Sequence, residues 1–110
     1  MMWKDYKSVE WADIELNKPI LSPSDLDMLW GAFFATGDSR YVKKIIDTLS
    51  WIELRNENEI QVLIAEAAKW SLSSNAKQHD LVMKICLKEE NIATGNQKES
   101  LKEIIGNAKK

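Results

Sequence analysis

Apolar residues recur along most of this chain at the spacing of amphipathic α-helices, and the clearest pattern lies between residues 22 and 50. A helix start is marked by Ser22-Pro23-Ser24-Asp25, which combines a capping serine, a proline suited to the first helical position and a capping-box acid. After the turn Thr36-Gly37-Asp38, the apolar residues of one buried helix face are Tyr41, Val42, Ile45, Ile46 and Leu49. We therefore expect an antiparallel helical hairpin over residues 22–50.

The first helix of this hairpin is apolar on nearly every side, and its large residues are Leu26, Met28, Leu29, Trp30, Phe33 and Phe34. A helix of this kind is normally buried on more than one side, so we expect the stability of the domain to depend on it. Gly37 can adopt the left-handed conformation that ends a helix, and Asp38 can cap the helix that follows.

A second helical hairpin is predicted over residues 58–90, where Asn58 and Gln61 can form a capping pair. One helix face is marked by Ile60, Leu63, Ile64, Ala67, Ala68 and Ser71. The run Ser73-Ser74-Asn75 is expected to break this helix, because short polar side chains compete for backbone hydrogen bonds. The helix after the break should present Leu81, Val82, Ile85 and Cys86.

The two ends of the chain carry different signals. A C-terminal helix over residues 96–106, capped by Asn96 and Glu99, has apolar positions at Leu101, Ile104 and Ile105. Residues 1–21 form an N-terminal arm that mixes apolar spacings of three and of two, so a short helix and an extended segment both fit. Its aromatic side chains should pack on the body of the domain or on another chain, and they are Trp3, Tyr6 and Trp11.

These segments predict one all-α domain over residues 1–110, in which antiparallel helical hairpins stack as a short solenoid-like bundle with right-handed progression. The chain also matches itself at an offset of 40 residues. Residues 41–46 fall on residues 81–86, and Trp30 falls on Trp70, although any two amphipathic helices share much of this apolar phase. A period near 40 lies in the range of HEAT and armadillo arrays.

The stretch from Leu26 to Ile46 resembles the helical hairpins of uncharacterised bacterial repeat proteins of tetratricopeptide-like or HEAT-like character. Ser74-Asn75-Ala76 and His79 look like part of the same pattern, so the resemblance covers about residues 22–90. The chain departs from the tetratricopeptide consensus in its period, about 40 residues rather than 34, and it lacks the Trp…Leu-Gly…Tyr spacing. The resemblance implies a helical fold used for binding, and it implies no substrate and no catalytic residue.

Composition and charge narrow the range of partners. The 110 residues carry 15 basic and 17 acidic side chains, 15 − 17 = −2, and 45% of them are apolar. Duplex binding needs clustered basic residues, and a membrane span needs about 18 uninterrupted apolar residues, so we expect no nucleic-acid partner and no membrane partner. The single cysteine, Cys86, favours a reducing compartment. We expect a cytoplasmic protein, or a secreted or periplasmic one if a leader peptide has been removed.

The residue types present do not predict an enzyme. His79 and Cys86 lie about 10 Å apart along a helix, too far for direct pairing, so we interpret them as a helix-start histidine and a small core cysteine. One histidine and one cysteine cannot supply a zinc site, and the pairs Asp25/Asp27 and Glu89/Glu90 are too sparse for a calcium loop. The scattered glycines form no phosphate cradle. We therefore expect no catalytic residue, no metal and no cofactor.

Five tryptophans are unusual in so short a chain. Trp30 and Trp70 are interpreted as filling the space between the hairpins, whereas Trp3, Trp11 and Trp51 are candidates for an exposed partner-binding patch. Our main hypothesis is a non-catalytic protein–protein interaction module or adaptor that binds another protein, because stacked hairpins leave a continuous groove. The alternatives are a small immunity- or antitoxin-type protein that blocks a partner enzyme, and a structural homo-oligomer such as a homodimer.

Overall fold

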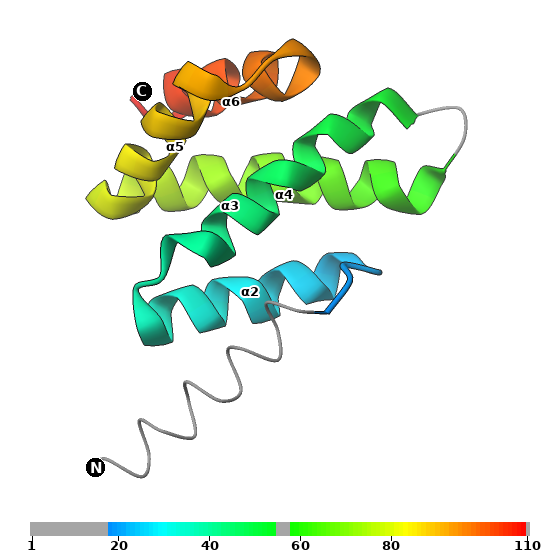
Figure 1. Ribbon diagram of the computed structural model, residues 1–110, viewed down its shortest axis with the longest axis horizontal. Helices are drawn as coiled ribbons and strands as arrows, with labels where there is room; N and C mark the ends of the chain where they lie inside the picture. Colours follow the sequence, from blue (N-terminus) through cyan, green and yellow to red (C-terminus); the bar gives the residue numbers. More distant parts are fainter. Residues whose placement is uncertain (1–17, 55–57, 110) are drawn as a thin grey trace, which may run out of the picture.

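Helices make up nearly all of the chain that the computed structural model describes, which comprises residues 18–54 and 58–109 (Figure 1). The α-helices are α2 (Pro23–Thr36), α3 (Ser39–Asp47), α4 (Glu59–Gln78), α5 (Asp80–Ile92) and α6 (Gly95–Ala108), and a 3-10 helix, η1 (Thr48–Leu54), follows α3. No strand occurs in these two ranges, so the all-α prediction is confirmed. The right-handed, solenoid-like progression stays a prediction.

Helix α2 begins where the sequence predicts. Pro23 occupies its first position, and the Asp25 carboxylate accepts hydrogen bonds from the backbone N–H groups of Leu21 (2.8 Å) and Ser22 (3.1 Å). These two donors lie before the helix and have no partner within it, so the acid fixes the direction in which the chain enters α2.

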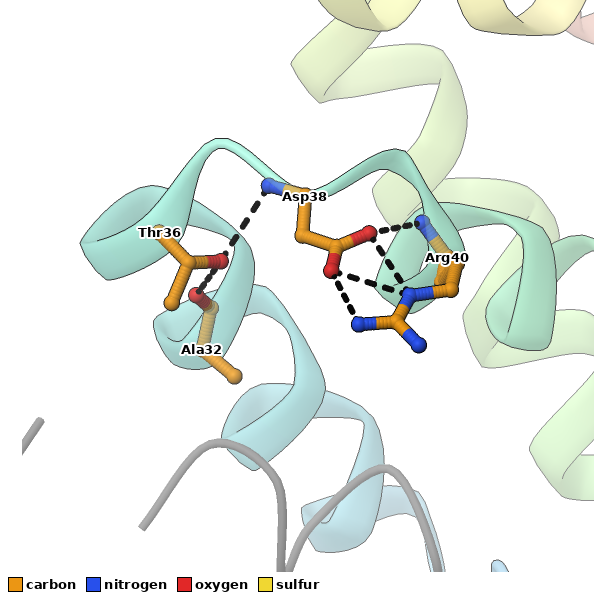
Figure 2. A network of polar contacts seen from close by, with 4 residues as sticks. All are labelled: Ala32, Thr36, Asp38 and Arg40. Carbon is orange, nitrogen blue, oxygen red and sulfur yellow. Dashed lines mark hydrogen bonds and ion pairs between the residues drawn. The ribbon is translucent and has the colours of Figure 1, made fainter. Parts of the chain in front are cut away.

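A two-residue turn reverses the chain between α2 and α3 (Figure 2). Gly37 takes the left-handed conformation, with a φ of 72°, as the sequence predicts. The Thr36 hydroxyl donates to the Ala32 carbonyl (2.8 Å) and accepts from the Asp38 N–H (3.1 Å). The Asp38 carboxylate in turn accepts the N–H of Arg40 (2.9 Å) and caps α3. Side chains on both sides of the turn therefore satisfy backbone groups that the helix ends leave open.

The two helices of this hairpin differ in how completely they are buried. All four predicted apolar residues of α3 are buried, and so is Leu49 in η1. Helix α2 lies at an edge of the molecule, and it buries Leu26, Leu29, Trp30, Ala32 and Phe33. Met28 and Phe34 are exposed, so the expectation of burial on several sides is wrong for them. By their helical positions they flank the buried residues of α2 on either side, and the Phe34 ring lies beside His79, the residue that follows α4.

Helix α4 lies in the middle of the molecule (Figure 1) and packs against η1, α6, α5, α2 and α3. Its buried residues are Val62, Ile64, Ala65, Ala68, Leu72 and Ala76. A hydrogen bond from Trp30 Nε1 to Ser71 Oγ (3.0 Å) joins α2 to α4 and satisfies the indole N–H of a tryptophan that is otherwise buried. The other elements are therefore arranged around α4.

Helix α4 continues through the segment where the sequence predicted a break, so that prediction is wrong. Ser73 Oγ donates to the Lys69 carbonyl (3.0 Å), and Asn75 Nδ2 donates to the Ser71 carbonyl (2.9 Å). These short polar side chains bond to carbonyls one turn earlier in the same helix, so they do not pull the backbone out of it. The turn into α5 falls at His79 instead.

The last two helices follow the predicted pattern with two corrections. Helix α6 buries its three predicted apolar residues, and α5 buries Val82, Ile85 and Cys86. Leu81 is exposed, because it stands on the first turn of α5, beside a connection whose residues are exposed from 77 to 80. Thr94, not Asn96, is the residue that precedes α6, and Gly95 takes a φ of 62° that a side chain would make costly.

The 3-10 helix η1 was not predicted, since the first hairpin was expected to end at residue 50. The chain continues in a tighter helix to residue 54, and the buried Thr48 hydroxyl donates to the Ile45 carbonyl (2.7 Å) at the junction with α3. This segment packs along α4 and also touches α3 and α6, so it forms part of the core.

Candidate functional site

Helix α4 carries apolar residues on two opposite faces. One face is buried, as described above. On the other face, Ile60, Leu63 and Trp70 are exposed by 58%, 57% and 77%. With Ala67, which is half-buried and packs against the edge of the core, they follow the i, i+3, i+7, i+10 spacing of a single stripe along the helix. We call these four residues the α4 stripe.

Two interpretations of the sequence are wrong for residues of the α4 stripe. Ile60 and Leu63 were placed on one face with Ile64 and Ala68, and Trp70 was placed between the hairpins. The structure buries Ile64 and Ala68 and exposes the other three residues. The error arose because two apolar stripes interleave along one helix. The exact spacing of 60, 63, 67 and 70 was the signal in the sequence that could have separated them.

The Trp70 side chain stands between two surface hollows. A hollow of about 420 Å³ opens between α2 and α4, where Pro23, Asp27 and Ala67 contribute to its lining. A second hollow of about 520 Å³ opens between α4, η1 and the end of α6, and Ile52 and Asn107 contribute to its lining. Trp70 contributes to the lining of both hollows.

Two polar side chains that line the larger hollow have partners within the protein. The Lys69 ammonium pairs with the Glu103 carboxylate of α6, and the Ser73 hydroxyl bonds to the backbone of its own helix. Throughout the described ranges, no buried side-chain nitrogen or oxygen lacks a hydrogen-bond partner. The hollow thus combines the apolar surface of Ile52 and Trp70 with charged and polar residues around it.

Of the three tryptophans predicted to bind a partner, the structure describes one. Trp51 is half-buried, packs against the core and lines a hollow of about 400 Å³ with Pro19, Leu21 and Gln61. Trp3 and Trp11 lie outside the described residues. The structure therefore places Trp51 in a partly exposed patch, and that patch is a different hollow from those beside Trp70.

His79 and Cys86 lie where the sequence interpretation put them. His79 is the exposed residue before α5, and its ring centroid lies 5.0 Å from that of Phe34. Cys86 is fully buried, and its burial, together with the nearby Glu89 carboxylate, raises the pKa of the thiol to about 12. A thiol with this pKa is protonated near neutral pH, so Cys86 lacks the thiolate character of a nucleophile.

Three of the four acids singled out in the sequence make structural contacts. Asp25 anchors the start of α2, Glu89 Oε1 lies 3.7 Å from Lys43 Nζ, and Glu90 Oε2 lies 3.3 Å from Lys98 Nζ. In the part of the chain that the structure covers, no three His, Cys, Asp or Glu side chains gather as they would around a metal ion.

Comparison with known proteins adds no family to this picture. No protein-family model, no curated protein and no solved structure matches the chain. Among the helices described, none is both long and apolar enough to cross a membrane. The function has therefore to be inferred from the geometry of the exposed α4 stripe and the hollows around it.

Proposed function

We propose that this chain is a non-catalytic protein–protein interaction module whose contact surface is the α4 stripe. The observation that carries the proposal is the 77% exposure of Trp70, in line with Ile60 and Leu63 on the outer face of the central helix. Contiguous exposed apolar side chains of this size mark interaction sites on soluble proteins, whereas single ones do not. Tryptophan is also the residue most enriched among those that dominate binding energy.

The shape of the surface supports a protein partner. A tryptophan offers about 150–250 Å² of surface to a partner, and burial of apolar area contributes about 25 cal/mol per Å². The two hollows that Trp70 lines can receive side chains of a partner. These side chains would exclude water from around the tryptophan, as happens at the residues that dominate binding energy in the centre of an interface. The stripe is supported by a helix that packs on five other elements, so little ordering is required on binding.

The test compares three variants with the parent chain. Proteins that co-purify with the tagged parent are identified, and the affinity of each purified partner is measured for Trp70→Ala, Leu63→Ala and Leu81→Ala. Leu81 is the control because it is an exposed apolar residue, 48% exposed, on α5 and away from the stripe. We expect Trp70→Ala to weaken binding by about 2 kcal/mol, about 30-fold, and Leu81→Ala to leave it unchanged. A specific partner that binds Trp70→Ala as tightly as the parent would refute the proposal.

A homodimer is the second candidate, and the stripe itself favours it. A two-fold interface needs a surface patch that is complementary to itself, and one stripe along a single straight helix meets that requirement when two copies pack antiparallel. Sedimentation equilibrium distinguishes the two candidates. A dimer that Trp70→Ala dissociates supports self-association, and a monomer at all concentrations supports a different protein as partner.

We also propose that the chain is a helical repeat protein of tetratricopeptide-like or HEAT-like character that works in the cytoplasm. The support is that Val42 and Val82 are both buried, as are Ile45 and Ile85, at equivalent positions 40 residues apart. The pair Trp30 and Trp70 does not share this equivalence, since one is buried and the other exposed. The single cysteine, a buried thiol, suits a reducing compartment.

A further inference from the structure

A further surface hollow, of about 460 Å³, lies between α3 and α5, and cationic side chains dominate it. Among the residues that line it are Arg40, Lys43, Lys84, Lys88, Glu89 and Ile92. This concentration of basic residues stands out because the whole chain carries a net charge of −2. None of these residues belongs to the α4 stripe.

Two of the four cations are already neutralised. The Arg40 guanidinium holds the Asp38 carboxylate, with Nε at 2.9 Å and the second nitrogen at 2.6 Å from Oδ2 (Figure 2). Lys43 Nζ lies 3.7 Å from Glu89 Oε1, and Glu89 is buried with a side-chain exposure of 10%. Removing Glu89 from solvent requires a cation beside it, so Lys43 has a structural role. Neither cation is fully available to a ligand.

Lys84 and Lys88 differ from the other two cations. Both are exposed, they lie one helical turn apart on α5, and neither forms an ion pair with any residue of the described chain. Like charges at this spacing repel and destabilise an isolated helix slightly. Asp80 lies one turn before Lys84, at the start of α5, where a negative charge is favourable for the helix in its own right. The hollow thus keeps two uncompensated positive charges that the fold does not require.

Apolar surface adjoins the two lysines. Ile92, at the end of α5, is exposed by 67%, and Ile85 lies between the lysines along the helix and contributes to the same hollow. A ligand that matches this arrangement carries at least two negative charges and an apolar group beside them. In a protein segment, acidic residues interleaved with leucine-like residues have this composition.

We infer that the face of α3 and α5 around Lys84, Lys88 and Ile92 is a docking site for an acidic, partly apolar segment of a partner protein. Charge complementarity supports this choice, because two uncompensated cations are too few to hold a duplex, whose backbone carries a phosphate about every 1.7 Å. Repulsion from the rest of the surface favours the same face. Without these two lysines the remaining charge of the chain is −2 − 2 = −4, so an acidic segment is steered to this face and away from the rest of the surface.

The experiment measures fluorescence anisotropy of a labelled twelve-residue peptide in which two glutamates and one leucine repeat. We expect the parent chain to bind it more tightly at low salt than at high salt. The variant Lys84→Gln/Lys88→Gln should weaken binding about five- to tenfold, which corresponds to two exposed ion pairs. Its melting temperature should equal or exceed that of the parent, because a repulsive pair is removed. The control is Lys102→Gln/Lys109→Gln, which removes two exposed lysines of the α6 region and should bind the peptide like the parent.

Two further peptides and two competitors make the result decisive. An all-glutamate peptide should bind more weakly than the leucine-containing one, and Ile92→Ser should abolish that difference. A lysine–leucine peptide should not bind. Equal affinity of the parent and Lys84→Gln/Lys88→Gln would overturn the inference. So would tighter binding, through the same two lysines, of a DNA duplex or of phosphatidylserine vesicles, because the ligand would then not be a protein segment.

Discussion

Phe33 and Phe34 are neighbours in α2, yet one is 3% exposed and the other 52%. Their ring centroids lie 5.4 Å apart, and both rings lie close to Trp30, at 6.2 Å for Phe33 and 5.9 Å for Phe34. Phe33 points into the core, whereas Phe34 covers the outer side of Trp30 and contacts the ring of His79. Burial, and not residue type, therefore sets how much each ring contributes to the stability of the domain.

Phe33→Ala is expected to destabilise the domain by about 3–5 kcal/mol, because it removes a buried ring and leaves a cavity in the core. Phe34→Ala is the matched control, and we expect a cost of about 1 kcal/mol or less, since the ring is half in water. Urea unfolding followed by circular dichroism measures both values. Similar losses in the two variants would show that the two rings are equally buried in solution.

At the scale of elements, the α2–α3 turn depends on one carboxylate. Asp38 caps α3, and the pKa of Asp38 is lowered by the hydrogen bond from the Arg40 side chain and then by that from the Arg40 backbone N–H. The unfolded carboxyl group keeps an ordinary pKa of 3.8, so the charged group stabilises the folded state above that pH. The contribution is lost as the pH falls through the lowered pKa of the folded protein.

Asp38→Ala is expected to cost about 1 kcal/mol at neutral pH, the usual effect of removing an N-cap, and less at pH 2, because protonation progressively removes the charge as the pH falls through the lowered pKa. Asp38→Asn keeps an acceptor at the cap, so it should be close to the parent at neutral pH and should lack the pH-dependent part. Denaturant titrations at the two pH values measure the differences. An alanine variant as stable as the parent at neutral pH would show that the cap contributes nothing to the hairpin.

At the scale of the whole molecule, exposed apolar side chains such as those of the α4 stripe form surfaces that residues 1–16 could cover. The described chain starts beside η1 and the first turn of α4: the Lys18 carbonyl accepts a hydrogen bond from Lys44, and Pro19 and Leu21 line a hollow with Gln61. Ordering the backbone of such an arm costs about 1–2 kcal/mol per residue in conformational entropy, whereas burying one large aromatic ring contributes about 2–3 kcal/mol. The arm therefore docks only when several aromatic rings are buried together. We therefore expect the arm to act as one unit that covers an apolar face.

Deletion of residues 1–16 is expected to uncover that face, so that the shortened chain aggregates, dissociates or binds a hydrophobic dye. Dye fluorescence and sedimentation of the parent and the shortened chain give the answer. Adding Trp70→Ala to the deletion tests whether the uncovered face is the α4 stripe, since the extra dye signal should then fall. A shortened chain of unchanged stability, mass and dye binding would mean that the arm is a tail whose tryptophans, Trp3 and Trp11, are free to bind a partner.

The sequence by itself determined the all-helical class and the α2–α3 hairpin, because their signals are local. Pro23 with Asp25, Gly37 and Asp38 act within one turn of where they stand, and the apolar period of α3 leaves one face to bury. The apolar spacing around Cys86 also predicted that this residue belongs to the core, where the structure places it. These features need no knowledge of distant neighbours, which is why they could be predicted.

Only the tertiary structure decided which apolar face of α4 is covered and which is left for a partner. Ile64 and Leu63 are adjacent and equally apolar, but α4 lies among helices that come from both ends of the chain, and these cover one side of it. The same holds for Trp70, which is 77% exposed although it was interpreted as filling the space between the hairpins. The pairing of Lys43 with Glu89, which leaves Lys84 and Lys88 uncompensated, joins α3 to α5. Burial and charge balance depend on segments far apart in sequence, so periodicity along one helix cannot assign them.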